Sequence, residues 1–340
     1  MGNGRYSRRE FGMLALAALP AAGAVVSTLR WTLPVGRWTL PTGTVFAQSR
    51  PDSVYGGVRV GVLAPFDFRA EAPDVESILK AMVRLGSNSV EMQNDAPEAF
   101  AGAPPAPPPA AAAGGGRGGR SPADIQAQNA WGMRLSAWRM RAPVAKFEEI
   151  RKMYDAAGVA IDAYRIQLTP DMLDDEIEYA FTATKVLGAR QITMQIPDAA
   201  LTARIGKFAE KHGIPAGYHS EAQAPETLWD QPLSQSPFNK IQLDIGNFVA
   251  AHKGGDSPVP FIQKYHDRIA SVHLKDRTKD GGGSFEFGKG ETPVREVLQL
   301  MKKERYTFPA FIEMGYPVPA GSTRIDEVAK CLKFAKDALA

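Results

Sequence analysis

The sequence predicts a single-domain (β/α)8 barrel, and two features of the chain carry this prediction. Eight strand-like segments alternate with helical segments between residues 55 and 338. Most of the strand-like segments are nearly continuous apolar runs, which is typical of parallel strands covered on both faces. A doubly wound open sheet is the alternative. It is disfavoured because the first strand-like segment is not followed by a G-x-G-x-x-G motif.

The expected elements can be given in chain order. The expected strands are 58–64, 88–92, 159–168, 190–196, 214–220, 240–246, 269–275 and 308–314. The expected helices are 74–86, 143–158, 171–188, 199–213, 292–304 and 323–339, with shorter ones at 225–235 and 257–266. Several helices end at a glycine, which adopts the left-handed conformation that stops a helix. Thr169 and Pro170 predict the N-cap and first position of the helix at 171–188.

One segment does not fit a barrel core. Residues 101–122 (AGAPPAPPPAAAAGGGRGGRSP) contain no large apolar side chain, and their proline and glycine content favours a solvated loop. The patterns on either side belong to one alternating series. We therefore expect an insertion into the barrel at 101–122 rather than a boundary between domains.

The N-terminal segment has the form of a twin-arginine export signal. Arg8 and Arg9 precede Phe11 and a run of alanine, leucine and valine. The run is too short and too rich in alanine for a membrane span, although an uncleaved anchor is the alternative. We expect a signal peptide over 1–47, cleavage after Ala47, no stable membrane insertion afterwards, and a periplasmic or secreted protein.

Charge and cysteine content limit the possible partners. Residues 1–47 hold five Lys or Arg and one acidic residue, so the remaining chain has 35 basic and 36 acidic side chains and a net charge of −1. This balance predicts no nucleic-acid partner. Cys331 is the single cysteine, so no internal disulfide can form, and we expect it to be a small buried residue rather than a nucleophile. A homo-oligomer is possible.

Polar side chains stand where several expected strands end. In (β/α)8 barrels the residues that carry out chemistry lie at the carboxyl ends of the strands. Carboxylates and imidazoles that converge there suit a divalent ion such as Mn²⁺, Mg²⁺ or Zn²⁺. The residues that meet this position test are Glu91, Gln195, His219, Glu221, Asp244, His273, Lys275 and Glu313.

The same test separates stronger candidates from weaker ones. Asp244, His273 and Glu313 end three successive strands, and buried charges that share one mouth imply a shared cation. Glu91 could instead cap a helix or pair with an arginine. Gln195 is expected to contact a ligand residue rather than the ion. The remaining histidines are expected to be structural or surface residues: His212, His252 and His266. Lys275 could instead form an ion pair with Asp276 or Asp244.

The motifs GYHSE, QLDIGNF, RIASVHLKD and FGKGETPVREVLQLMKKERYTFPAFIEMGY make the chain similar to the xylose isomerase-like TIM barrels, the sugar phosphate isomerase/epimerase superfamily. The resemblance covers roughly residues 55–338. It implies a divalent ion held at the ends of four successive strands by His219 or Glu221, Asp244, His273 and Glu313. The epimerases of this family have a glutamate where this chain has His219, so the strand-five ligand stays open.

The resemblance and the site chemistry imply a metal-dependent sugar isomerase or epimerase that works through an enediolate. Glu221 or Glu313 would remove the proton, the other acid or His219 would return it, and Lys275 would contact a substrate oxygen. Sugar phosphates are scarce outside the cytoplasm, so we expect a small non-phosphorylated sugar or keto-sugar as substrate.

Three other functions are compatible with parts of the sequence. Elimination from a 3-keto-glycoside, by a lyase or dehydratase, would use the same site. A non-catalytic sugar-binding protein and an endonuclease IV-like phosphodiesterase are less favoured, the latter because it needs more histidine ligands and a basic groove. Trp131, Trp138 and Trp229 are candidates for stacking on sugars or for ordinary packing.

Overall fold

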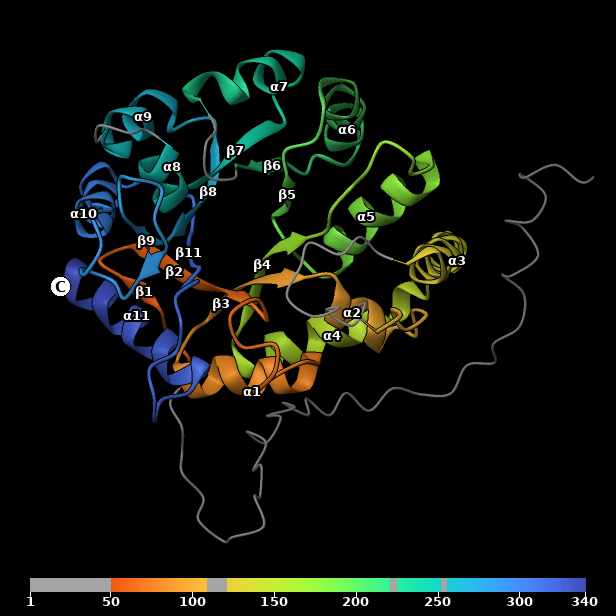
Figure 1. Cartoon of the computed structure of the whole chain (residues 1–340), viewed down its shortest axis with the longest axis horizontal. Helices are drawn as coiled ribbons and strands as arrows, with labels where there is room; N and C mark the ends of the chain where they lie inside the picture. The colour runs from red at the N-terminus through yellow and green to blue at the C-terminus, as the bar shows by residue number, and fades with distance from the viewer. Residues whose placement is uncertain (1–49, 109–120, 221–224, 252–255) are drawn as a thin grey trace, which may run out of the picture. The chain divides into compact units, whose positions relative to one another are not determined.

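Eight parallel strands close into a barrel in the computed structural model, which describes residues 50–108, 121–220, 225–251 and 256–340 (Figure 1). Their order around the barrel is β2-β11-β8-β7-β6-β5-β4-β3, and β3 pairs with β2 to complete the circle. This closure confirms the predicted (β/α)8 barrel and rules out the open sheet. The strands are β2 (Val58–Ala64), β3 (Ser89–Gln93), β4 (Ala160–Arg165), β5 (Gln191–Gln195), β6 (Ala216–His219), β7 (Asn239–Asp244), β8 (Ile269–Leu274) and β11 (Ala310–Ile312).

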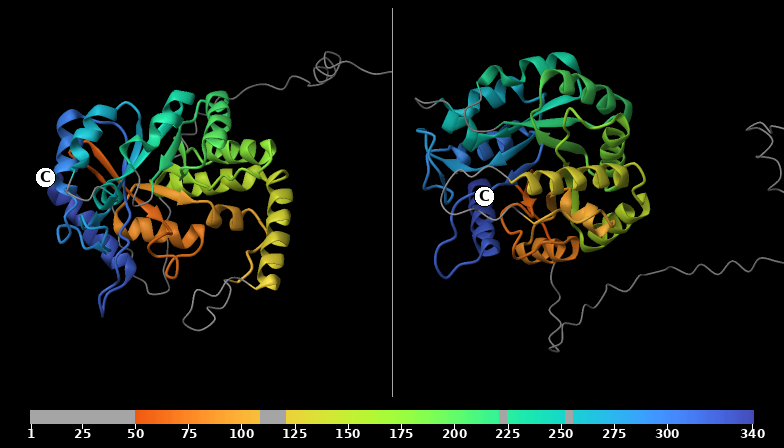
Figure 2. Two further views of the ribbon diagram at one scale, coloured as in Figure 1. Left: turned by 45° about the horizontal axis from the view of Figure 1, so that its top comes forward. Right: turned by 45° about the vertical axis from the view of Figure 1, so that its right-hand side comes forward.

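Helices surround the strands on the outside (Figures 1 and 2). Glycines at positive φ end three of them: Gly86 after α1, Gly158 after α4 and Gly213 after α6. The helices are α1 (Val75–Leu85), α2 (Asp95–Phe100), α3 (Pro122–Arg139), α4 (Val144–Ala157), α5 (Asp174–Val186), α6 (Ala199–His212), η2 (Glu226–Trp229), α7 (Asp230–Gln235), α8 (Ile245–Ala251), α9 (Pro258–Tyr265), α10 (Val294–Glu304) and α11 (Arg324–Leu339).

Three short strands lie outside the barrel. β1 (Val54–Tyr55) pairs antiparallel with β2. β9 (Asp276–Arg277) and β10 (Ser284–Phe285) form a two-stranded ribbon directly after β8. The ribbon therefore stands on the face of the barrel where the parallel strands end.

The start of α5 differs from the sequence prediction. Leu173 occupies the N-cap position, so the helix begins at Asp174 and the expected cap at Thr169 is wrong. The carboxylate of Glu176 accepts a hydrogen bond from the amide of Leu173 at 3.2 Å, and three acidic residues stand in the first turn. These acids favour the positive end of the helix dipole, which explains the later start.

Three helices of the described chain were not predicted: α2, α3 and α8. α3 begins at Pro122, the last residue of the expected insertion, with Ser121 as its N-cap and a reciprocal hydrogen bond from Asp124. The central part of that insertion, 109–120, lies outside the described residues. α8 begins directly after Asp244, within the segment expected to be a strand up to 246. The carboxylate of Asp244 accepts from the amide of Asn247 at 2.8 Å and so stabilises this early helix start.

Two sets of side chains fill the molecule. Apolar side chains lie between the strands and the helices, and Cys331 of α11 is among them with 2 % exposure, which confirms its predicted burial. The buried polar side chains on the strands include Glu91, Thr193, Gln242 and Ser271. Hydrogen bonds join these four across the barrel and provide a polar base for the strand ends.

No helix within the described ranges is both long and apolar enough to cross a membrane. The expected signal peptide, residues 1–47, lies outside the residues that the structure describes.

Candidate metal centre

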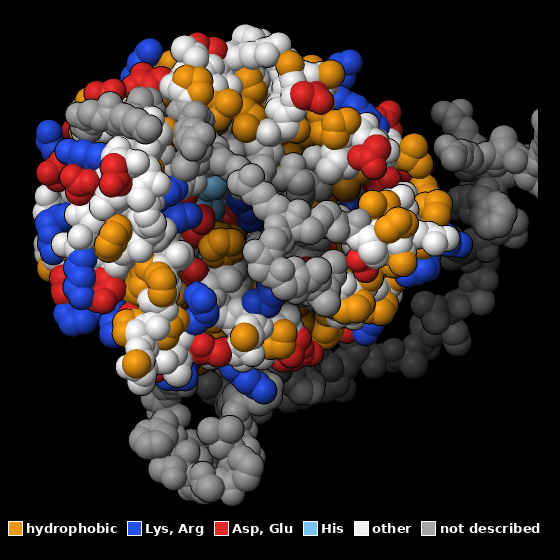
Figure 3. Space-filling model, in the orientation of Figure 1, with side chains coloured by type: hydrophobic (Ala, Val, Ile, Leu, Met, Phe, Trp, Pro, Cys, Tyr) orange, Lys and Arg blue, Asp and Glu red, His pale blue; other side chains and the backbone are white. Residues whose placement is uncertain are grey.

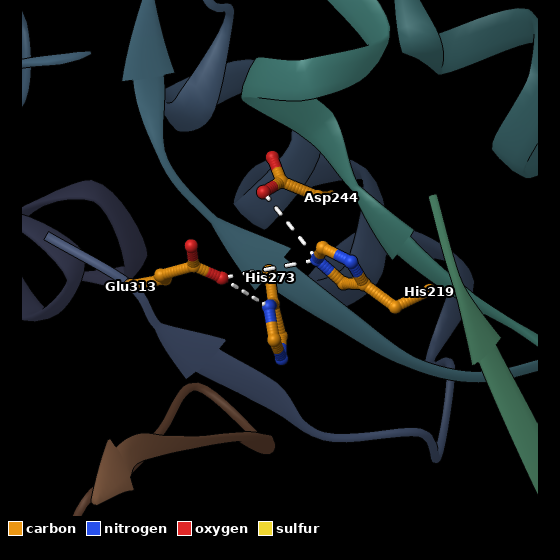
Figure 4. A group of neighbouring side chains, drawn as sticks. All are labelled: His219, Asp244, His273 and Glu313. Carbon is orange, nitrogen blue, oxygen red and sulfur yellow. Dashed lines mark hydrogen bonds and ion pairs between the residues drawn. The ribbon is translucent and has the colours of Figure 1, made fainter. Parts of the chain in front are cut away.

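Four side chains from consecutive barrel strands meet at the carboxyl ends of the strands. His219 ends β6, Asp244 ends β7, His273 is the penultimate residue of β8 and Glu313 follows β11 directly. Each offers one ligand atom, and these atoms all lie within 4.8 Å of one another (Figure 4). All four are buried. Figure 3 shows a hollow in the middle of this face with acidic, basic and histidine side chains inside it.

The imidazole of His219 is held with one nitrogen free. Its Nδ1 atom lies 3.1 Å from Oε1 of Gln195, the last residue of β5. Because an amide oxygen only accepts hydrogen bonds, Nδ1 carries the hydrogen and the lone pair is on Nε2. Burial lowers the pKa of His219, which favours this neutral form. Gln195 therefore orients His219, as the sequence suggested for this amide.

The free nitrogen of His219 faces two carboxylates. Nε2 lies 3.6 Å from Oδ2 of Asp244 and 3.8 Å from Oε2 of Glu313. Both distances are too long for hydrogen bonds. Nε2 of His219 and Oδ2 of Asp244 are among the buried polar atoms that have no hydrogen-bond partner within the described chain. Electron pairs that converge in this way fit a divalent cation, which would satisfy both atoms at once.

His273 lies between two carboxylates. Its Nδ1 is 2.6 Å from Oε2 of Glu313 and its Nε2 is 2.6 Å from Oε2 of Glu91. Burial lowers the pKa of His273, but the charge of Glu91 and the hydrogen bonds to both glutamates outweigh burial and raise it to about 9. The ring is therefore a cation here, and it would give up the Nδ1 proton to become a ligand while keeping the bond to Glu91.

Glu91 supports His273 from below and is not part of the four-residue cluster. It accepts hydrogen bonds from Thr193 Oγ1 at 2.6 Å and from Gln242 Nε2 at 2.9 Å, and Arg165 Nη1 lies 3.5 Å away. Burial raises the pKa of Glu91, but His273 and Arg165 outweigh it and lower the value to about 2. Glu91 therefore pairs with an arginine, Arg165, as one reading of the sequence expected, and it also orients His273.

Lys275 brings a positive charge to the cluster. Its Nζ atom donates to Oε1 of Glu313 and lies 3.6 Å from Oδ2 of Asp244. Burial lowers the pKa of Lys275, but these two carboxylates outweigh it and raise it. Gly246 allows α8 to approach closely, since a Cβ atom there would lie 2.6 Å from the carbonyl oxygen of Lys275. Of the two partners expected for Lys275, Asp244 lies within ion-pair distance, but the hydrogen bond of Lys275 goes to Glu313.

Asp276 has a structural task next to the site. Its carboxylate accepts from the backbone amides of Gly288, Gly290 and Thr292 at 2.8, 3.1 and 3.1 Å. A Cβ atom on Gly290 would lie 2.2 Å from Oδ1 of Asp276, so only glycine fits there. Asp276 thereby ties the loop before α10 to the end of β8.

The other residues singled out in the sequence lie elsewhere. Trp229 is buried and donates to the carbonyl of Tyr218 at 2.9 Å, and Trp138 packs edge-on against Tyr179. Both are packing residues. Trp131 of α3 is half-buried and lines a cavity beside this helix. His212 ends α6 and His266 follows α9, both at the opposite end of the barrel from the cluster. Glu221 and His252 lie outside the described residues.

Comparisons with known proteins find similarity in structure but not in sequence. No family model and no curated protein matches the sequence. The probable 3-DHS dehydratase AsbF of Bacillus anthracis has a TM-score of 0.56 at 11% identity, and the similarity covers 82% of this chain and 99% of that one. A xylose isomerase domain protein of Alicyclobacillus acidocaldarius has a TM-score of 0.55 at 14% identity, with the same coverage. D-psicose 3-epimerase has a TM-score of 0.51 at 14% identity, covering 83% of this chain and 97% of that one. The chain therefore shares its barrel fold with proteins described as a dehydratase, a xylose isomerase domain protein and a sugar epimerase.

Proposed function

We propose that this protein is a divalent-metal-dependent isomerase or epimerase of a small, non-phosphorylated sugar or keto-sugar. The observation that carries the proposal is the pair of buried atoms without partners, Nε2 of His219 and Oδ2 of Asp244, inside a four-residue donor cluster. The barrel fold shared with D-psicose 3-epimerase supports the substrate class.

His219, Asp244, His273 and Glu313 would hold the ion. Two imidazoles with two carboxylates suit Mn²⁺ or Zn²⁺ better than Mg²⁺, which prefers oxygen ligands. A bound divalent ion would polarise a substrate carbonyl and stabilise negative charge on its oxygen. The hydrogen bonds that His219 donates to Gln195 and His273 donates to Glu91 would keep both rings in the orientation that this requires.

The reaction needs a base, a stabilising cation and a returned proton. We assign proton removal from the carbon beside the carbonyl to Glu221, which follows His219 by two residues, or to Glu313. The C–H electron pair forms a C=C bond while the carbonyl π electrons move to oxygen, and Lys275 donates a hydrogen bond to that oxygen. Return of the proton to the same carbon from the other side gives an epimer. Return to the former carbonyl carbon gives an isomer, because the neighbouring hydroxyl then passes its proton to the enediolate oxygen and becomes the new carbonyl. His219 is a weaker proton donor than the sequence suggested, because Gln195 holds its Nδ1 hydrogen.

Elimination is the second candidate, and the structural similarity to a probable dehydratase favours it. The first step is the same proton removal. The new electron pair then expels a hydroxyl or an alkoxy group from the next carbon, which leaves as water or an alcohol after protonation. We further propose, from the Arg8–Arg9 motif, that the protein is exported, which agrees with a non-phosphorylated substrate.

A solvent-exchange experiment tests the proposed function. The Mn²⁺- or Zn²⁺-loaded protein is incubated in D₂O with a panel of ketoses and 3-keto-glycosides, and proton NMR follows the C–H signals beside the carbonyl. Loss of one of these signals for at least one compound, abolished by Lys275→Met together with Glu313→Gln, supports the proposal. Exchange in a product that has gained deuterium and lost no other group indicates isomerisation or epimerisation, whereas release of water or alcohol indicates elimination. The absence of exchange on every compound contradicts the enediolate route.

A further inference from the structure

A second cavity lies beside the metal centre on the same face of the barrel. It has a volume of about 680 Å³, within the range of small-molecule sites. Its walls come from α3 and from the segments that follow β3 and β4, represented by Asn94 and Gln167. Because segments after barrel strands lie at the carboxyl end of the barrel, the cavity and the metal cluster share this face.

Two hydrogen bonds connect the cavity wall to the metal cluster. Oε1 of Gln167, in the wall, accepts from the backbone amide of Gln195 at 2.9 Å. The side chain of Gln195 in turn bonds to Nδ1 of His219 at 3.1 Å. A substrate whose reacting sugar lies at His219 could therefore extend toward the cavity with a group attached to that sugar.

The cavity wall combines an aromatic ring, thioethers and amides. Trp131 is held in place by a hydrogen bond from its Nε1 to the carbonyl of Pro104 at 3.0 Å, and Met172 lies in the same wall. Gln128 and Asn129 add amide groups. Indole rings stack on flat or ring-shaped groups, and amides donate and accept hydrogen bonds with hydroxyl groups.

The charges of the wall favour a neutral occupant. The cation in it, Arg139, is held by Glu98 through two hydrogen bonds of 2.9 and 3.2 Å, and Glu176 lies 4.0 Å away. A hydrogen bond from Thr169 lowers the pKa of Asp171, another lining residue, and keeps it ionised. A phosphate or carboxylate group would meet these acids without a free cation among the described residues that line the cavity.

We propose that this cavity binds a neutral, ring-shaped group attached to the reacting sugar, so that the substrate is a keto-glycoside rather than a free monosaccharide. The proposal rests on the proposed function, because it places the reacting sugar at the metal cluster. An aromatic aglycone and a second sugar ring share the chemistry that the cavity recognises.

Calorimetric titration of the metal-loaded full chain tests the proposal. The probes are methyl β-D-glucoside, phenyl β-D-glucoside, 4-carboxyphenyl β-D-glucoside and cellobiose, together with the corresponding β-D-galactosides. We expect the phenyl glycoside or the disaccharide to bind at least about tenfold more tightly than the methyl glycoside for one of the two sugars. The carboxyphenyl glycoside should bind only slightly more tightly than the methyl glycoside, because its carboxylate meets the acids of the wall. A difference for the phenyl compound identifies an aromatic aglycone, and a difference for the disaccharide identifies a second sugar.

Variants of α3 assign the difference to the cavity. Trp131→Ala should reduce the affinity difference between the ring-bearing probe and the methyl glycoside to less than about twofold, and Trp131→Phe should keep at least part of this difference. Gln128→Ala should reduce the difference while leaving the bond between Trp131 and Pro104 intact. Arg134→Ala is the matched control, since Arg134 is exposed on the same helix and does not line the cavity. Equal affinity for all neutral probes, no binding of any probe, or a difference that survives Trp131→Ala overturns the proposal.

Two measurements on the same samples separate this proposal from the proposed function. Metal content and D₂O exchange test the metal centre directly. If both are positive and the affinity difference is absent, only the glycoside proposal fails. If metal binding or exchange is absent, the proposed function fails, whatever the glycoside titration shows.

Discussion

The Nε2 atom of His219 lies 3.6 Å from the Oδ2 atom of Asp244, and neither buried atom has a hydrogen-bond partner within the described chain. A buried polar atom without a partner costs about 1–3 kcal/mol of stability. The neighbouring side chains do not relieve this cost, because Gln195 holds the His219 hydrogen on Nδ1 and Lys275 is directed to Glu313. A divalent cation between the two atoms would relieve both.

Lys275→Met should tighten metal binding and weaken catalysis. The Lys275 ammonium lies on Glu313 and near Asp244, so it competes with a cation for the same carboxylates. We expect metal affinity to rise about tenfold or more and turnover to fall by about 100-fold or more. Calorimetric metal titration and the exchange rate in D₂O measure the two effects.

Lys279→Met is the matched control for this variant, because Lys279 is an exposed lysine only four residues farther along the chain. It should change neither quantity. Unchanged metal affinity in Lys275→Met would show that the ammonium does not compete for the site.

The metal-free protein should lose stability as the pH rises from 6.5 to 9. The pKa of His273 is raised from 6.5 to about 9 in the folded state, so its proton stabilises the fold fully below pH 6.5 and this contribution disappears as the pH passes 9. The shift corresponds to about 3 kcal/mol. Urea unfolding at pH 6, 7.5 and 9 in the presence of a chelator measures it.

Two histidine variants check the origin of this pH dependence. His273→Asn should remove most of the loss between pH 6.5 and 9. His266→Asn, at an exposed histidine far from the cluster, should leave it in place. The same slope in His273→Asn as in the unmodified protein would exclude His273 as its cause.

Glu91→Gln should weaken both the fold and the metal site. Glu91 is fully buried and is the charge partner of His273 Nε2, so its neutralisation leaves a buried cation with one carboxylate fewer. We expect a loss of about 3–5 kcal/mol in the metal-free protein at pH 7 and an about 10–100-fold loss of metal affinity. Glu148→Gln, at an exposed position on α4, should change the free energy of unfolding by less than about 0.5 kcal/mol. Metal affinity equal to that of the unmodified protein would show that Glu91 does not support metal binding.

Asp276→Asn should loosen the loop 286–292. Asp276 accepts three backbone hydrogen bonds from this loop, and an asparagine side chain offers one oxygen in place of two. Amide hydrogen exchange at Gly288, Gly290 and Thr292 should become faster, with a stability loss of about 1.5–3 kcal/mol. Asp280→Asn, at an exposed aspartate of the neighbouring ribbon, should leave exchange in the loop unchanged. Equal exchange in both variants would contradict the anchoring role.

The sequence was sufficient to predict the barrel and the strand-end positions of the cluster. Parallel barrel strands are buried on both sides, so they leave continuous apolar runs, and the residue that ends each run must lie at the carboxyl face. For this reason Asp244, His273 and Glu313 could be placed together before any contact was known. The start of α5 was misplaced because Thr169-Pro170 and the acids at 174–176 are competing start signals of the same kind.

The supporting contacts could not be predicted from local patterns. Glu91 and His273 are 182 positions apart, and Glu91 and Gln242 are 151 apart, so their hydrogen bonds depend on how the barrel closes. Arg165 at the end of β4 passes the same position test as the other strand-end residues, and it was the signal that sequence reasoning overlooked. The cavity beside α3 was missed with α3 itself, whose start, Ser121-Pro122, looked like the end of the insertion.

Metal content is the most direct test of the central claim that these four side chains bind a divalent cation. The purified chain is dialysed against Mn²⁺ or Zn²⁺ and then against metal-free buffer, and elemental analysis gives the metal bound per chain. We predict about one equivalent for the unmodified protein and almost none for Asp244→Asn, which keeps an oxygen for the amide of Asn247 and so preserves the start of α8. Full metal occupancy in Asp244→Asn, or none in the unmodified protein, would contradict the claim.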